Sequence, residues 1–372
     1  MNASLSPAMA LKGNVARMRL LHGAVLVAMG LFLGGQAGAA TSRSRENADL
    51  QLAQGWDKVF PQSTNVEHRK VTFKNRYGIT LAADLYLPKK RRGKLAGIAV
   101  GGPFGAVKEQ SSGLHAQTLA EHGFATLAFD ASYTGESGGT PRNVASPDIN
   151  TEDFSAAVDF LGLLPEVDRE RIGILGICGW GGMALNAAAV DKRVKAVVAS
   201  TMYDMTRIMS KGYNDSVTLE QRTQVLEQWG RQRWQDAESG APAYQPPYNV
   251  LKGGEAQFLV DYADYYMTPR GYHARAVNSG NGWTVTTPLS FMNMPLLTYI
   301  AEISPRPVLF VHGENAHSRY FSETAYAAAA EPKELLIVEG ASHVDLYDRL
   351  DKIPFDKLAA FFGEHLVQAA GR

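Results

Sequence analysis

A short glycine-rich segment carries the single cysteine of this 372-residue chain. Residues 176–182 read Gly-Ile-Cys-Gly-Trp-Gly-Gly, after the apolar run Ile172–Ile177 and before a stretch of small residues. A strand that turns sharply into a helix at a reactive side chain is the context of a nucleophile elbow, where glycines let the two backbones pass closely. Because the first amides of a helix stabilise an anion, we expect Cys178 to be a nucleophile with a lowered thiol pKa.

The elbow departs from the common Gly-x-nucleophile-x-Gly pattern, because Trp180 stands where the second glycine is expected. A register shift would place Trp180 at the apex, where an indole offers no nucleophile. We therefore interpret the motif as Gly-x-Cys-x-x-Gly and expect Trp180 to line the substrate pocket. The structural alternative is an inert, buried Cys178 in a glycine-rich turn.

A second segment, Gly135–Gly139, matches Gly-x-Ser-x-Gly literally. Residues 130–134 separate it from the preceding apolar run, and Pro141 follows in place of an apolar helix. The strand–turn–helix context is therefore missing, and Ser137 is predicted to be a loop residue at the rim of the site.

A thiol nucleophile needs a base. His343 follows the last predicted strand and precedes the last predicted helix, which is where the histidine falls in the order nucleophile, acid, histidine. His312 is interpreted as structural, and His317 as a weaker pocket candidate. His343 is therefore the expected base.

The third member of such a triad is expected after the strand that ends at His312. The usual position of the acid, four residues after that histidine, holds Ala316. Glu314 is the nearest carboxylate and our choice for orienting the imidazole, with Asp204 as the alternative.

An oxyanion formed during attack needs two N–H donors. The amide after the nucleophile, Gly179, is the expected first donor. The second is expected from the glycine-rich loop Gly101–Glu109, at Phe104 or Gly105, and Gly105 is also expected at the substrate pocket.

Apolar runs that alternate with helical patterns surround these residues. Val66–Phe73 and Ile79–Leu87 predict an antiparallel hairpin. Further strands are predicted at Leu95–Val100, Phe124–Phe129, Ile172–Ile177, Val194–Ser200, Pro307–His312 and Glu334–Val338, and helices at Ser111–His122, Glu152–Leu163, Gly181–Val190, Thr218–Asp236, Tyr320–Ala330 and Pro354–Ala369. This alternation predicts an α/β protein with a mostly parallel, doubly wound sheet.

The alternation of strand and helix patterns stops between residues 202 and 304, which predicts a helical cap inserted into the core. The expected organisation is a signal peptide at 1–39, a polar lead-in at 40–65, the first part of the core at 66–201, the cap at 202–304, and the second part of the core at 305–372.

The leader predicts export. Residues 1–39 hold Lys12, Arg17 and Arg19, no acidic residue, a short apolar run and a small-residue exit that ends at Ala39. These are the parts of a secretory signal, and the apolar run is short for a membrane span. We expect cleavage after Ala39 and a periplasmic or secreted protein without stable membrane insertion, with an uncleaved anchor as the alternative and Met18 as a possible start.

Composition excludes several classes of protein. The chain has 37 basic and 37 acidic residues, and removal of the leader leaves a small acidic excess. A nucleic-acid binder normally shows a basic excess, so no nucleic-acid partner is expected. One cysteine excludes a disulfide framework, and the histidines do not cluster at metal-ligand spacing. We expect no metal and no cofactor.

The ordered motifs GGPFGAVKEQ, FDASYTGESGGTPR, LGICGWGG, ISPRPVLFVHGENAHSRYFSE and GASHVDLYD resemble α/β-hydrolases related to dienelactone hydrolase. The resemblance covers roughly Val66 to Phe362 and is closest to a branch that includes polyketide transferases. It implies the α/β-hydrolase fold and a Cys–His–Asp triad, with Cys178 and His343 in the first two roles.

The leading hypothesis is an exported hydrolase of esters, lactones or thioesters that forms an acyl-enzyme on Cys178 from a small-molecule acyl substrate. An acyltransferase of the same mechanism is the close alternative. A Xaa-Pro-type peptidase and a non-catalytic binder of apolar ligands are the others. Substrate identity and oligomeric state are not determined by the sequence.

Overall fold

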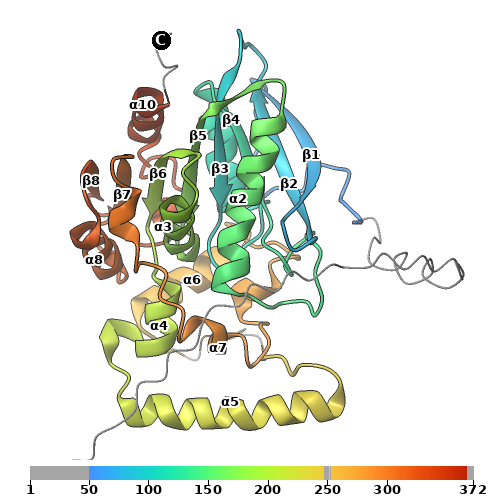
Figure 1. Ribbon diagram of the computed structural model, residues 1–372, viewed down its shortest axis with the longest axis vertical. Helices are drawn as coiled ribbons and strands as arrows, with labels where there is room; N and C mark the ends of the chain where they lie inside the picture. Colours follow the sequence, from blue (N-terminus) through green and yellow to red (C-terminus); the bar gives the residue numbers. More distant parts are fainter. Residues whose placement is uncertain (1–49, 247–250, 252, 367–372) are drawn as a thin grey trace, which may run out of the picture. The chain divides into compact units, whose positions relative to one another are not determined.

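An eight-stranded sheet with the order β1-β2-β4-β3-β5-β6-β7-β8 organises the protein (Figure 1). The computed structural model describes residues 50–246, 251 and 253–366. The predicted leader and the last residues of the final predicted helix lie outside this range. The strands are β1 Val66–Lys74, β2 Thr80–Pro88, β3 Leu95–Gly101, β4 Ala125–Phe129, β5 Val167–Ile177, β6 Val194–Ser200, β7 Val308–Gly313 and β8 Lys333–Val338.

The pairing confirms a mostly parallel sheet. β1 and β2 form the predicted antiparallel hairpin, in which Val66 lies opposite Pro88. β2 also pairs antiparallel with β4, and every pair from β4 through β3 to β8 is parallel. The central strands are buried over most of their length, as expected where helices cover both faces of a sheet.

Helices connect the strands as the sequence predicts, and the cap contributes additional ones. The α-helices are α1 Ser111–Glu121, α2 Pro147–Leu163, α3 Gly179–Val190, α4 Met205–Lys211, α5 Leu219–Ser239, α6 Gln257–Met267, α7 Pro288–Phe291, α8 Arg319–Ala328, α9 Asp345–Asp348 and α10 Phe355–His365. The prediction for α2 began five residues late, because Pro147 and Asp148 already belong to its first turn. Proline is well tolerated at the start of a helix.

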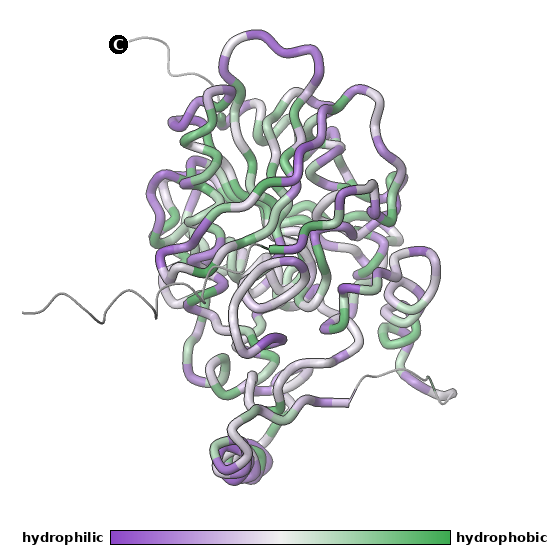
Figure 2. Tube along the Cα trace, turned by 90° about the vertical axis from the view of Figure 1, so that its right-hand side faces the viewer, coloured by the Kyte–Doolittle hydropathy of each residue, from purple (hydrophilic) through white to green (hydrophobic). Residues whose placement is uncertain are grey.

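Two hydrophobic clusters fill the space on either side of the sheet. One joins the sheet to α2, α3 and α8 through residues such as Phe154, Met183 and Phe321. The other joins it to α1 and α10 through residues such as Leu119 and Phe361. Figure 2 shows the hydrophobic segments mostly in the interior of the fold and the hydrophilic segments mostly in its outer loops.

The segment between β6 and β7 contains α4 to α7 and lies below the sheet in the view of Figure 1. It coincides with the segment for which the sequence predicts a cap, and it is called the cap segment below. Its longest helix, α5, begins after a Thr218 capping box, has Gly240 in a left-handed conformation at its end, and has no buried residue. Within residues 50–246, 251 and 253–366, no helix combines the length and apolar character that a membrane span requires.

Candidate active site

Cys178 lies at the junction of β5 and α3, as the elbow predicts. Its backbone has φ 57° and ψ −125°, a conformation that costs a non-glycine residue free energy and clusters at functional sites. The neighbouring glycines are required by close contacts. A Cβ on Gly176 would lie 2.1 Å from the carbonyl oxygen of Trp180, and one on Gly181 would lie 2.5 Å from Cβ of Met202.

Two backbone amides face the sulfur. The N–H groups of Phe104 and Gly179 donate hydrogen bonds toward the Cys178 thiol and lower its pKa. These are the two donors that the sequence predicts for the oxyanion hole. Gly105 does not share this position, because its φ of +94° turns it toward the backbone of Asn278, where a Cβ would meet the carbonyl oxygen at 2.5 Å. Its role is to allow the loop to pass close to the cap segment.

The thiol is held in its neutral form. Burial raises the pKa of Cys178 above its ordinary value, and this effect outweighs the hydrogen bond with Tyr347 and those from the N–H groups of Phe104 and Gly179. The expectation of a lowered thiol pKa at the start of α3 was therefore wrong. Desolvation of an anion in an apolar surrounding exceeds the stabilisation from the helix terminus here.

His343 lies in the same site, fully buried in the loop between β8 and α9. Its Nδ1 atom is 2.9 Å from Oγ1 of Thr201 and 2.5 Å from Oγ of Ser318. Its Nε2 atom is 2.9 Å from the hydroxyl of Tyr347. Burial first, and the neighbouring His317 and His312 next, hold the imidazole pKa well below its usual range. The imidazole is therefore neutral in the resting site.

A hydroxyl, not a carboxylate, orients this imidazole. Ser318 Oγ also lies 2.9 Å from Nε2 of His312, and Nδ1 of His312 lies 2.6 Å from Oγ of Ser322. His312, interpreted from the sequence as structural, thus supports the orienting serine. Burial lowers its pKa to about 3, which keeps it neutral.

Neither predicted acid contacts His343. Glu314 is exposed, and its Oε2 atom accepts a hydrogen bond from the N–H of Gly340 at 2.9 Å. Asp204 caps α4 by accepting from the N–H groups of Thr206 and Arg207. The assignment of Glu314 as the orienting acid is therefore corrected, because its side chain points to a loop amide and a serine fills the place beside Nδ1.

Trp180 does not line the cavity at Cys178. Its ring packs in the core with its centroid 5.3 Å from those of Phe129 and Phe154. The second residue of α3 points into the cluster beneath the sheet edge, so the expected contact with substrate is corrected. Ser137 is also not at the rim, because it is buried and its Oγ bonds to the N–H of Ala82 and the carbonyl oxygen of Asp130.

A cavity of about 610 Å³ opens beside Cys178. Its walls are mostly apolar or aromatic. They come from the glycine-rich loop Gly101–Glu109, the segment after β6, and helices α4, α6 and α9. The lining comprises Phe104, Cys178, Tyr203, Met205, Ile208, Leu251, Glu255, Leu259, Tyr262, Ala263, Tyr266, Met267, Ser279 and Tyr347. His317 lies behind this wall, stacked on Phe258 and bonded to the hydroxyl of Tyr203.

The site also contains Thr201, Ser318 and Tyr347, which were not predicted from the sequence. Tyr347 stands four residues after His343, but the two do not share a helix because His343 precedes α9, so the spacing alone did not indicate their contact. Ser318 and Thr201 had no signal in the sequence, because serine and threonine are common and their hydroxyls meet the imidazole only through tertiary contacts.

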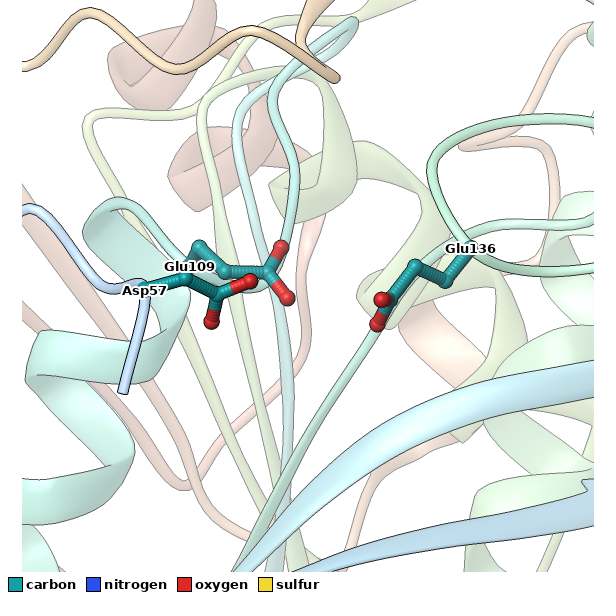
Figure 3. A group of neighbouring side chains, drawn as sticks. All are labelled: Asp57, Glu109 and Glu136. Atoms are coloured by element: carbon teal, nitrogen blue, oxygen red, sulfur yellow. The ribbon is translucent and has the colours of Figure 1, made fainter. Parts of the chain in front are cut away.

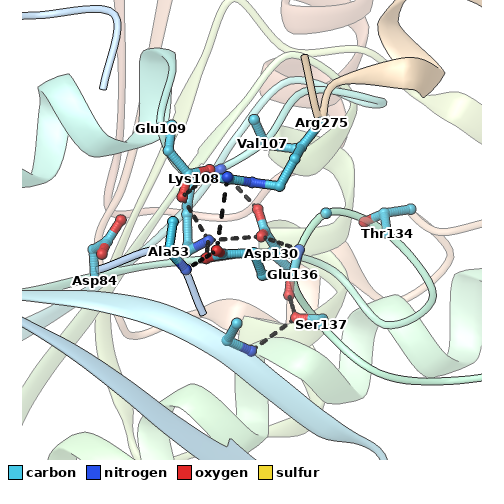
Figure 4. A network of polar contacts seen from close by, with 12 residues as sticks. Ala53, Asp84, Val107, Lys108, Glu109, Asp130, Thr134, Glu136, Ser137 and Arg275 are labelled. Carbon is cyan, nitrogen blue, oxygen red and sulfur yellow. Dashed lines mark hydrogen bonds and ion pairs between the residues drawn. The ribbon is translucent and has the colours of Figure 1, made fainter. Parts of the chain in front are cut away.

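A separate cluster of carboxylates, Asp57, Glu109 and Glu136, has oxygen atoms within 4.8 Å of one another (Figure 3). The positively charged side chains of Lys108 and Arg275 lie beside Glu109 and Glu136 (Figure 4). Lys108 lies 2.7 Å from Glu109 and 2.6 Å from Glu136, and Arg275 lies 2.8 Å from Glu109. These ion pairs form a largely buried network that links the glycine-rich loop Gly101–Glu109 to Arg275 in the segment between β6 and β7.

The chain belongs to the alpha/beta hydrolase family, whose model matches residues 101–353. The strand order, the elbow and the histidine after β8 agree with this assignment. The family and its relatives support hydrolase activity as the general class.

The particular relatives include thiohydrolases and acyltransferases. The chain is 78% identical to PA2218 of Pseudomonas aeruginosa over 94% of this chain and 95% of that protein. The crystal structure of PA2218 matches with a TM-score of 0.85 over 86% of this chain and all of the other. Thiohydrolase aneE of Aspergillus aculeatus is 36% identical over 36% of this chain and 41% of its own length. Polyketide transferase grgF of Penicillium is 28% identical over 74% of this chain and 89% of its own length.

Proposed function

We propose that this protein is an acyl hydrolase that cleaves an ester, lactone or thioester through an acyl-enzyme on Cys178. The observation that carries the proposal is the position of the sulfur. It sits on a strained elbow, faces the amides of Phe104 and Gly179, and borders the apolar cavity. This is the arrangement that attack on a carbonyl and stabilisation of the resulting oxyanion require.

The reaction has two halves. The thiol proton passes to His343 as the sulfur forms a bond with the carbonyl carbon, and the carbonyl electron pair moves to the oxygen held by the two amides. The leaving alcohol or thiol then takes the proton from His343 as its bond to the carbonyl carbon breaks. A water molecule then gives a proton to the same imidazole as its oxygen bonds to the thioacyl carbon. The carbon–sulfur bond breaks, the acid is released, and the imidazole returns the proton to the Cys178 sulfur.

The cavity supports an apolar or aromatic acyl group. Met205, Ile208 and Leu259 offer no hydrogen bonds, so the chain of the substrate is recognised by burial of apolar surface. Relatives named thiohydrolases favour a thioester among the possible substrates.

An acyltransferase is the second candidate. A cavity of about 610 Å³ has room for an alcohol or amine beside an acyl-enzyme, and one relative is named a polyketide transferase. The acceptor would attack the same thioacyl carbon in place of water.

The test is a panel of acyl thioesters, aryl esters and lactones of graded chain length, with and without alcohol acceptors. Release of product is compared for wild type, Cys178→Ala, Cys178→Ser and Ser137→Ala. The proposal expects turnover in wild type and Ser137→Ala and none in Cys178→Ala. Turnover that survives in Cys178→Ala would overturn the cysteine mechanism, and binding without any turnover would favour a non-catalytic module.

Export of this enzyme is also a proposal, supported by the composition of residues 1–39. N-terminal sequencing of the protein recovered from the periplasm or the medium tests it. An N-terminus at Ala40 is expected, and a full-length chain in the cytoplasmic fraction would contradict it.

A further inference from the structure

Tyr347 occupies the space between the candidate nucleophile and its base. It lies on α9 and is fully buried. Its hydroxyl is 2.9 Å from Nε2 of His343 and is hydrogen-bonded to the thiol of Cys178. Among the described residues, no direct hydrogen bond joins Cys178 to His343.

The phenol is held in place by its ring. The ring centroid of Tyr347 lies 5.1 Å from that of Tyr265, 6.2 Å from that of Tyr266 and 5.4 Å from that of His343, each in an edge-to-face arrangement. Edge-to-face contacts of this kind restrain an aromatic side chain. The hydroxyl therefore has a defined position at the wall of the cavity, which it also lines.

The hydrogen bonds around His343 have one consistent direction. Ser318 can donate to Nε2 of His312 while it accepts from Nδ1–H of His343. Thr201 donates to the carbonyl oxygen of His343 and accepts from the same Nδ1–H. With the ring proton on Nδ1, a tautomer that these contacts accommodate, Nε2 is left as an acceptor for the hydroxyl of Tyr347.

We infer that Tyr347 is a catalytic residue that relays the proton between the Cys178 thiol and Nε2 of His343. The inference rests on the proposed acyl-enzyme mechanism and adds a residue to it. The thiol S–H donates to the phenol oxygen, and the phenol O–H donates to Nε2.

The relay balances atoms and charge. As the sulfur bonds to the carbonyl carbon, its proton moves to the phenol oxygen and the phenol proton moves to Nε2. The carbonyl electron pair becomes the oxyanion held by the amides of Phe104 and Gly179. The reverse transfer, from imidazolium through the phenol, delivers a proton to the leaving alcohol or thiol as its bond breaks.

The two proton transfers are concerted. Burial raises the pKa of Tyr347 well above its ordinary value, so a free phenolate does not accumulate. Burial likewise disfavours the thiolate of Cys178 and the imidazolium of His343. Because the phenol stays neutral in such a relay, no phenolate, thiolate or imidazolium has to form before carbonyl attack begins.

The test compares Tyr347→Phe with Tyr265→Phe. Both variants remove one hydroxyl from the same aromatic cluster, but that of Tyr265 makes no hydrogen bond to Cys178 or His343 within the described residues. Single-turnover acylation of Cys178 by an aryl ester is followed by release of the chromophore and by intact mass. The relay predicts a loss of about 100-fold or more for Tyr347→Phe, with a rate that rises with hydroxide concentration, and little change for Tyr265→Phe.

Wild type supplies a second readout that does not depend on the folding of a variant. In mixtures of H₂O and D₂O, two protons in flight give a bowed plot of acylation rate against deuterium fraction. A linear plot, or acylation by Tyr347→Phe at the wild-type rate and pH profile, would overturn the relay while leaving Cys178 acylated. Failure of wild type to form any acyl adduct on Cys178 would instead overturn the proposed function.

Discussion

Replacing Ser318 by Ala tests the unusual partner of the candidate base. The substitution removes the hydroxyl that lies 2.5 Å from Nδ1 of His343 and 2.9 Å from Nε2 of His312. Thr201 still contacts Nδ1 at 2.9 Å, so the imidazole keeps one orienting partner. Nε2 of His312 loses its hydroxyl partner in a buried site, which lowers the free energy of unfolding by about 1–3 kcal/mol.

During acylation His343 becomes an imidazolium, and the loss of one hydrogen bond to its charged Nδ1–H is worth about 1.5–3 kcal/mol. Because each 1.4 kcal/mol of activation free energy corresponds to a factor of ten in rate, the acylation rate is expected to fall roughly 10- to 100-fold. Glu314→Gln is the matched control, since its amide oxygen can still accept from Gly340 and it should change the rate by less than about twofold. Both rates are measured by single-turnover acylation with an aryl ester at neutral pH.

The opposite pattern would refute this reasoning. If Glu314 acted as the triad acid, Glu314→Gln would lower the rate by about four orders of magnitude, as loss of a triad carboxylate does. Ser318→Ala would then leave the acylation rate nearly unchanged.

Three further predictions concern the elbow, the ion network and the thiol. Gly176→Ala should destabilise the fold by about 3 kcal/mol or more, because its Cβ would lie 2.1 Å from a backbone oxygen. Gly230→Ala in α5, where nothing lies within 4 Å of the added Cβ, should instead stabilise the fold by up to about 1 kcal/mol. Both changes are measured by urea unfolding. Equal effects would contradict the close contact. Glu136→Gln should lower the free energy of unfolding by about 3 kcal/mol at pH 7. The ion pairs lower the pKa of Glu136 to about 2, so its stabilisation is complete above the ordinary value near 4.5 and the difference from wild type should shrink as pH falls toward 2; a difference that persists there would argue against the ionic origin. Alkylation of Cys178 by iodoacetamide should show a midpoint above the ordinary cysteine value of about 8.5, because burial raises the thiol pKa, and a midpoint near 7 would contradict this.

The sequence was sufficient to predict the elements that carry the site. Apolar runs separated by helical patterns predicted the parallel core, and the strand–turn–helix pattern predicted the positions of Cys178 and Gly179. The glycine-rich loop Gly101–Glu109 left Phe104 and Gly105 as alternatives for the second amide. His343 followed from its position after the last strand. These predictions rest on local patterns, which survive folding because each element has a fixed hydrophobic periodicity.

The remaining features depend on tertiary contacts. The helix terminus at α3 predicted a lowered thiol pKa, but burial reverses its sign. Trp180 faces the core because α3 begins immediately after Cys178, a boundary that the sequence placed two residues later. Ser318 contacts His343 only because the β7–α8 loop passes beside the β8–α9 loop. This tertiary contact leaves no pattern of residue spacing in the sequence.

The central claim is that an acyl group becomes attached to Cys178. The most direct measurement is intact mass followed by peptide mapping of wild-type protein quenched with acid during turnover of an acyl thioester. We expect a mass increase equal to the acyl group on the peptide that contains Cys178, and no such adduct in Cys178→Ala. An acyl group mapped to a different residue, or turnover of the thioester by Cys178→Ala, would contradict it.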